Sequence, residues 1–146
     1  AMMITVLISG NILLQFPLGW LADRMDRYRL LFICGCCVLI GACLVPLVVK
    51  IPVIFWPALV LLGVSAGGVY TLSMIIVGQR FQGVQLVTAN AAFGVLWGFG
   101  SLAGPMAGGF GMRLLNPDGL PLTIAIAAAL FLAIFIVRRW YERRLA

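Results

Sequence analysis

The chain has 146 residues, of which 64% are hydrophobic and 10% are charged, and its formal net charge is +6. Soluble domains have about 45–50% apolar and about 25% charged residues, and so short a chain cannot bury the excess apolar surface. The composition excludes a soluble globular domain. Because the basic residues fall in short clusters between apolar segments, it also argues against a basic nucleic-acid-binding module.

Long apolar segments follow one another along the chain, each near or above the roughly 20 residues that a helix needs to cross a bilayer. The five predicted spans are 2–21, 30–49, 52–78, 83–112 and 120–137. Unpaired backbone groups are costly in lipid, so these segments are expected to be helices. The sequence therefore predicts one all-α membrane bundle over residues 1–146. The two longest segments could tilt in the bilayer because of their length, or they could break at the prolines that they contain, Pro57 and Pro105.

Basic residues are unequally divided between the two sides of the predicted bundle. Eight of them lie in the 22–29 loop, in the segment near 79–83 and in the tail, whereas the other side has only Lys50 and Arg113. Cytoplasmic loops carry the excess of Lys and Arg in membrane proteins. We therefore expect the 22–29 loop and the C-terminus in the cytoplasm, and Ala1 outside.

The residues that usually bind metals or perform catalysis are scarce. There is no histidine, and all four cysteines lie within one apolar segment, at Cys34, Cys36, Cys37 and Cys43. A zinc site needs converging ligands, so we expect these to be small apolar helix residues, with no metal and no cofactor. The predicted spans contain no nucleophile with a base and no Asp, Glu, His or Lys near their middle. This pattern argues against an enzyme and leaves no proton relay inside these five segments.

The loop after the first segment carries a spaced pattern of Gly19, Asp23, Arg24 and Arg27. An ordinary basic loop explains the arginines, but it does not explain the fixed spacing of the glycine and the aspartate. The pattern resembles motif A of the major facilitator superfamily, although Asp26 stands where a glycine is usual and Tyr28 where a second basic residue is usual. The resemblance implies a transporter of twelve helices, in which this loop helps to latch one conformation of the transport cycle.

The fourth segment contains a stripe of small residues, made of Gly94, Gly98, Gly100, Gly104 and Gly108. Glycines four apart let a neighbouring membrane helix approach closely. With Pro105, the stripe also resembles the glycine-proline motif that is typical of antiporters in the same superfamily, at their fifth helix. General small-residue packing explains the stripe equally well.

The resemblance leaves two places for the chain among the twelve helices. The glycine-proline motif favours helices two to six. The stretch around Gln85 and Asn90, together with Gly67 and Tyr70, favours helices eight to twelve, because it resembles the last helices of the YcaD-type branch of bacterial inner-membrane transporters. We choose helices eight to twelve, with which the arginine-rich tail agrees. Five helices are one fewer than the six of a complete transporter half. We therefore expect a fragment whose partner is the missing N-terminal half of the same transporter.

Polar residues within the spans are candidates for contact with a substrate, because burying them unpaired costs free energy. The candidates are Asn11, Gln15, Tyr70, Asn90, Trp97 and Ser101. A cavity with amide, hydroxyl and indole groups suits a small polar or amphipathic solute. Hydrogen bonding between helices is the common alternative use of such residues.

The sequence thus predicts part of a transporter that moves a small solute by alternating access across a bacterial inner membrane. Two alternatives remain open. One is a half-size membrane scaffold that dimerises through its glycine faces and transports nothing. The other is the N-terminal half of a drug antiporter of the same superfamily.

Overall fold

The computed structural model describes residues 19–144, apart from the side chains of Pro117 and Arg143. Within this range the chain forms helices and no strand. A helical segment at 19–24 is followed by α2 (Arg27–Val48), α3 (Pro52–Arg80), α4 (Val84–Leu115), the 3-10 turn η1 (Asn116–Asp118) and α5 (Gly119–Arg144). The four long helices have the length and composition to cross a membrane. The protein is an all-α membrane helix bundle.

The bounds of these helices can be set beside the predicted spans. Each of α2 to α5 overlaps one of the segments expected at 30–49, 52–78, 83–112 and 120–137, and extends past it at one end or both. The remaining segment, 2–21, lies almost wholly outside the described residues. The fragment of it at 19–21 is helical.

Local sequence signals mark where the helices begin and end. The Asp26 carboxylate accepts a hydrogen bond from the Tyr28 N–H (3.1 Å) and caps the start of α2, as aspartate does at many helix N-termini. Pro52 is the first residue of α3, where its missing N–H costs nothing. The turn between α3 and α4 includes Gly83 with φ +57°, a conformation that glycine adopts without a Cβ clash.

The two prolines at which a break was expected do not interrupt their helices. Pro57 lies within α3 and Pro105 within α4, and both helices are continuous through them. With 32 residues, α4 has a length of about 48 Å at 1.5 Å per residue. This exceeds the hydrocarbon thickness of about 30 Å, so α4 must tilt or extend beyond the apolar layer.

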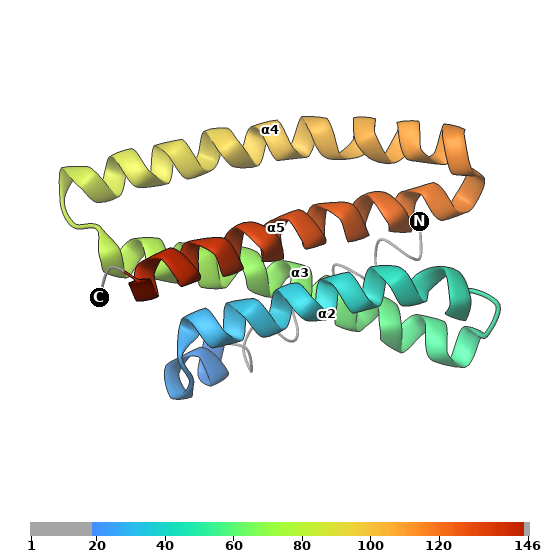
Figure 1. Ribbon diagram of the computed structural model, residues 1–146, viewed down its shortest axis with the longest axis horizontal. Helices are drawn as coiled ribbons and strands as arrows, with labels where there is room; N and C mark the ends of the chain where they lie inside the picture. Colours follow the sequence, from blue (N-terminus) through green and yellow to red (C-terminus); the bar gives the residue numbers. More distant parts are fainter. Residues whose placement is uncertain (1–18, 145–146) are drawn as a thin grey trace.

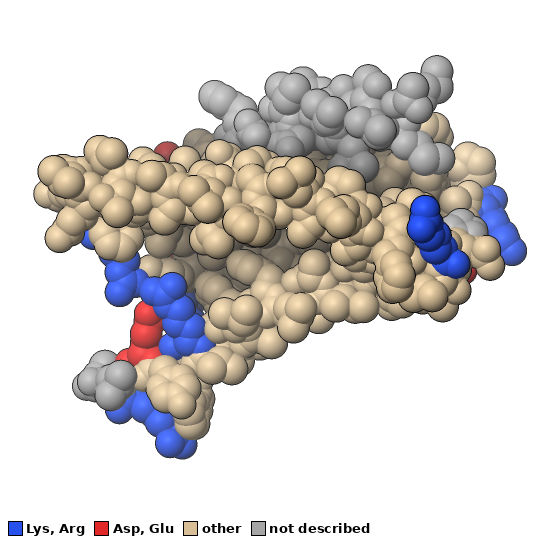
Figure 2. Space-filling model, turned by 90° about the horizontal axis from the view of Figure 1, so that it is seen from above, with Lys and Arg blue, Asp and Glu red and all other residues tan. Residues whose placement is uncertain are grey.

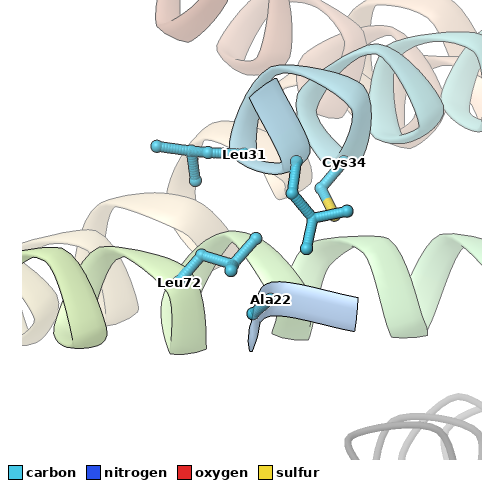
Figure 3. Packing of buried hydrophobic residues seen from close by; sticks show 5 residues of the cluster. Ala22, Leu31, Cys34 and Leu72 are labelled. Atoms are coloured by element: carbon cyan, nitrogen blue, oxygen red, sulfur yellow. The ribbon is translucent and has the colours of Figure 1, made fainter. Parts of the chain in front are cut away.

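Helix α2 packs against both α3 and α5. Figure 3 shows Leu31 and Cys34 on α2, and below it Leu72 of α3 next to Ala22 of the preceding helical segment; the four side chains belong to one buried cluster. Leu72 is fully buried, and Cys34 is a buried free thiol. Cys34 therefore fills space in an apolar contact, as a small hydrophobic residue does.

The contact between α2 and α5 depends on Gly35. A Cβ at this position would lie 2.9 Å from both Leu132 Cδ2 and Phe131 Cε1 of α5. Real Cβ contacts are not this short, so a larger residue would push the two helices apart. Small residues at membrane helix contacts serve this purpose, because van der Waals packing drives helix association in lipid.

Helix α4 differs from the other long helices in its exposure. Among its residues only Gly108 is buried, and Figure 1 shows α4 running along the top of the molecule, with α5 between it and the pair α2 and α3. Its strongest helix contact is with α5, and it packs only slightly against α3.

Charged side chains lie at the two ends of the helices. The start of α2, the end of α3 and the end of α5 lie at the same end of the bundle (Figure 1). This basic end comprises residues 23–29, Arg80 and residues 138–144. Figure 2 shows blue and red side chains gathered at this end, and separate blue side chains at the other. The opposite end has Lys50, Arg113 and Asp118.

Candidate functional site

The carboxylate of Asp26 holds together two helix ends at the basic end. Its Oδ2 lies 3.7 Å from Arg29 Nε of the same helix and 3.7 Å from Arg139 Nη2 of α5. The Arg139 guanidinium also lies over the Tyr28 ring, 5.8 Å from its centroid. These side chains are partly exposed, and ion pairs of this kind contribute about 0–1 kcal/mol each. Together they connect the end of α5 to the start of α2.

The predicted motif residues form a second, weaker contact at the junction before α2. Asp23 Oδ1 lies 3.8 Å from Arg27 Nη2, across the two non-helical residues between the first helical segment and α2, and the Asp23 side chain is 78% exposed. The Nε of Arg27 is buried without a hydrogen-bond partner among the described residues. Arg24 instead lies over the Trp20 ring, 4.0 Å from its centroid. Nothing described lies within 4 Å of a Cβ placed on Gly19.

A hollow of about 530 Å³ opens beside this junction. It is bordered by the loop before α2 and by the end of α3, including Asp23, Asp26, Arg27, Gln79 and Arg80. Its lining combines carboxylates, guanidinium groups and an amide. Such a hollow can receive polar side chains from a neighbouring part of a protein, because carboxylate and guanidinium groups form charge-assisted hydrogen bonds.

A second group of candidate residues lies between α3 and α4. The Tyr70 ring meets the Trp97 ring edge-on, with centroids 4.6 Å apart and planes at 61°. Tyr70 also meets Phe93 of α4, at 5.5 Å and 61°. Edge-to-face contacts of this kind add about 0.5–1.5 kcal/mol beyond the area that they bury. Trp97 remains 57% exposed, so its indole is available to other molecules.

The remaining polar candidates differ in their surroundings. Ser101 Oγ donates a hydrogen bond to the Trp97 carbonyl (2.9 Å) and lies exposed on the same face of α4. Asn90 is exposed on that face, two helical turns before Trp97. The structure therefore brings Tyr70 and Trp97 into contact and aligns Asn90 and Ser101 with them. Asn11 and Gln15 lie outside the described residues.

The glycine stripe of α4 has one close helix contact among residues 19–144. A Cβ on Gly108 would lie 2.9 Å from Leu120 Cδ1 of α5, whereas nothing described lies within 4 Å of a Cβ on the other four glycines of the stripe, Gly94, Gly98, Gly100 and Gly104. The use of those four as a packing surface stays a prediction.

Sequence reasoning missed the role of Asp26. It treated this residue only as a departure from a glycine, yet Asp26 caps α2 and pairs with α5. An aspartate directly before an apolar helix is a recognised N-cap signal, so the cap could have been predicted. The partner Arg139 could not, because no local pattern indicates which helix ends meet.

A family model described as Major Facilitator Superfamily matches residues 1–145. A protein of Salmonella arizonae named "Uncharacterized MFS-type transporter YcaD" is 30% identical over 131 residues, which cover 90% of this chain and 33% of the relative. An uncharacterized MFS-type transporter of an Enterobacter species is 28% identical over 137 residues, with the same coverage. The chain thus spans about a third of the length of these relatives. No solved structure matches it.

Proposed function

Because the chain belongs to the major facilitator superfamily, we propose that it is part of a transporter that moves a small solute across a membrane by alternating access. The names of the relatives support transport in general. We assign the chain to helices eight to twelve of such a transporter. The N-terminal half of the same protein is then its partner, and the assembled protein is not an enzyme.

The contact between Asp23 and Arg27 is the observation that carries this proposal. It joins the end of one helical segment to the start of the next across 3.8 Å, with an exposed carboxylate, beside an open polar hollow. A transporter alternates between states that differ by contacts made in one state only. A weakly held carboxylate beside a hollow can exchange its partner between two such states.

We further propose that the basic end faces the cytoplasm of a bacterial cell, with the protein in the inner membrane. Eight of the ten Lys and Arg residues belong to this end, and cytoplasmic loops carry such an excess. This orientation puts the C-terminus in the cytoplasm.

The solute is expected to contact the aromatic and polar face between α3 and α4. Tyr70 and Trp97 offer ring surfaces with one polar atom each, and Asn90 and Ser101 continue this face along α4. Such a lining suits a small amphipathic or polar solute. Among residues 19–144 all carboxylates lie at or near the helix ends. A proton relay, if the transporter uses one, therefore belongs to another part of the protein.

The substitution Asp23→Asn tests the proposed latch. In the full-length protein we expect transport into proteoliposomes to fall about tenfold per inserted molecule, because an amide replaces a charge-assisted contact that one state needs. Asp118→Asn at the opposite end is the matched control and should leave transport unchanged. Loss of inserted protein with normal transport per molecule would show that Asp23 serves insertion instead.

A further inference from the structure

A groove of about 400 Å³ lies between α2 and α5 at the basic end. Phe32 and Ile33 of α2 line its inner part, as does Ile136 of α5. Arg29, Arg139 and Trp140 line it about one turn closer to the helix ends. The groove therefore changes from apolar to basic along the helix axes.

Aromatic rings and branched side chains form the inner part. The Phe32 and Phe135 rings lie with centroids 5.9 Å apart and connect the two helices. Ile33 is 45% exposed and Ile136 53% exposed, so the groove is open on one side. In a membrane bundle, lipid acyl chains occupy an open apolar groove within the spans, because the bilayer core is hydrocarbon and contact with water is unfavourable for apolar side chains.

The outer part of the groove has an excess of positive charge. Arg29 and Arg139 share the single carboxylate of Asp26, and Arg144 adds a third guanidinium over the Trp140 ring, 3.7 Å from its centroid. The neighbouring Arg138 is paired with Glu142 at 3.3 Å. The Arg29 side chain is 75% exposed, and a guanidinium has five N–H donors. Most of its donors therefore face outward.

Trp140 lies at the boundary between the two parts and is 49% exposed. Indole rings are enriched where the hydrocarbon layer meets the lipid headgroups. Along the groove, apolar side chains are followed by an indole and then by guanidinium groups. This order matches that of an acyl chain, a glycerol backbone and a phosphate in a phospholipid.

We propose that this groove binds one anionic phospholipid from the leaflet at the basic end. An acyl chain lies along Phe32, Ile33 and Ile136, and the phosphate accepts hydrogen bonds from Arg29 and Arg139. Guanidinium groups pair well with phosphate oxygens, and basic pockets between membrane helices bind anionic headgroups. The inference goes beyond the proposed function, because it holds for any transported solute.

Native mass spectrometry of the full-length protein with added phosphatidylglycerol or phosphatidylcholine of identical acyl chains tests the inference. We expect at least tenfold tighter binding of phosphatidylglycerol. The variant Arg29→Gln/Arg139→Gln should weaken it about 30-fold, because each basic residue near an anionic lipid contributes about fivefold. Arg29→Gln alone, on an exposed side chain, should weaken it about fivefold without affecting folding. Arg113→Gln at the opposite end is the matched control and should change nothing.

A second variant tests the apolar part of the groove. Ile33→Trp fills the open wall without changing charge, so bound phosphatidylglycerol should be lost while the unfolding midpoint stays the same. Equal binding of both lipids, or unchanged binding in the charge variants, would overturn the proposal. Competition by glycerol 3-phosphate at the same affinity would also overturn it, because it would show a plain anion site. These experiments measure lipid binding and not transport, so their outcomes do not depend on the latch proposed at Asp23.

Discussion

Helices α2 and α4 are both apolar and long enough to cross a membrane, yet they pack differently. Buried residues of α2 face both neighbouring helices, whereas in α4 only Gly108 is buried among the described residues. Apolar composition therefore does not determine which helix is central in this bundle. Lipid tails solvate an apolar side chain as well as a neighbouring helix does. The shape of the helix surfaces and the positions of small residues therefore determine which helices pack together.

The exposed length of α4 is informative because its residues are not those of a plain lipid-facing helix. It carries five glycines with nothing described within 4 Å of their Cβ positions, and a polar and aromatic face around Trp97. Under the proposed function, contacts for this surface come from the rest of the transporter and from the solute. Three experiments test the difference between the packed helices and the exposed one.

The largest effect is expected from Gly35→Leu in α2. The new Cβ alone would lie 2.9 Å from two α5 side chains, so α5 must move, and overpacking of this kind costs about 3 kcal/mol. The free energy of unfolding, measured by SDS titration of the full-length protein, should fall by this amount. Gly78→Leu in α3 is the control, because nothing described lies within 4 Å of its Cβ. An equal loss in both variants would mean that leucine disturbs these helices regardless of packing.

A matched pair of leucines gives the next largest effect. Leu72 is fully buried and Leu102 of α4 is 72% exposed. Leu72→Ala should lower the free energy of unfolding by about 2 kcal/mol, because it leaves a cavity, and Leu102→Ala by less than about 0.5 kcal/mol. The same titration measures both. A similar loss at Leu102 would show that α4 is packed in the assembled protein as the contact between α2 and α3 is here, and would remove the contrast between α4 and the packed helices.

The sequence predicted the fold class because the length and apolar character of the segments depend only on local composition. It also singled out Asp23 and Arg27 through their spacing in the motif A-like loop, and the structure places these two side chains 3.8 Å apart. It could not predict that Arg139 meets Asp26 or that Tyr70 meets Trp97, because these contacts depend on which helices are neighbours. A hydropathy pattern without strong amphipathic faces does not specify neighbours. Asn11 and Gln15 remain predictions.

The smallest effect concerns the contact that joins α4 to α3. A double-mutant cycle of Tyr70→Ala and Trp97→Ala should give a coupling free energy of about 1 kcal/mol, as edge-to-face rings do. The Phe32 and Phe135 rings, 5.9 Å apart in the packed region, provide the comparison cycle, with a similar value expected. Coupling near zero for Tyr70 and Trp97 alone would mean that α4 is held through α5 and not through α3. The aromatic face would then be free to move with α4 relative to α3, which a solute site between the two helices could use in alternating access.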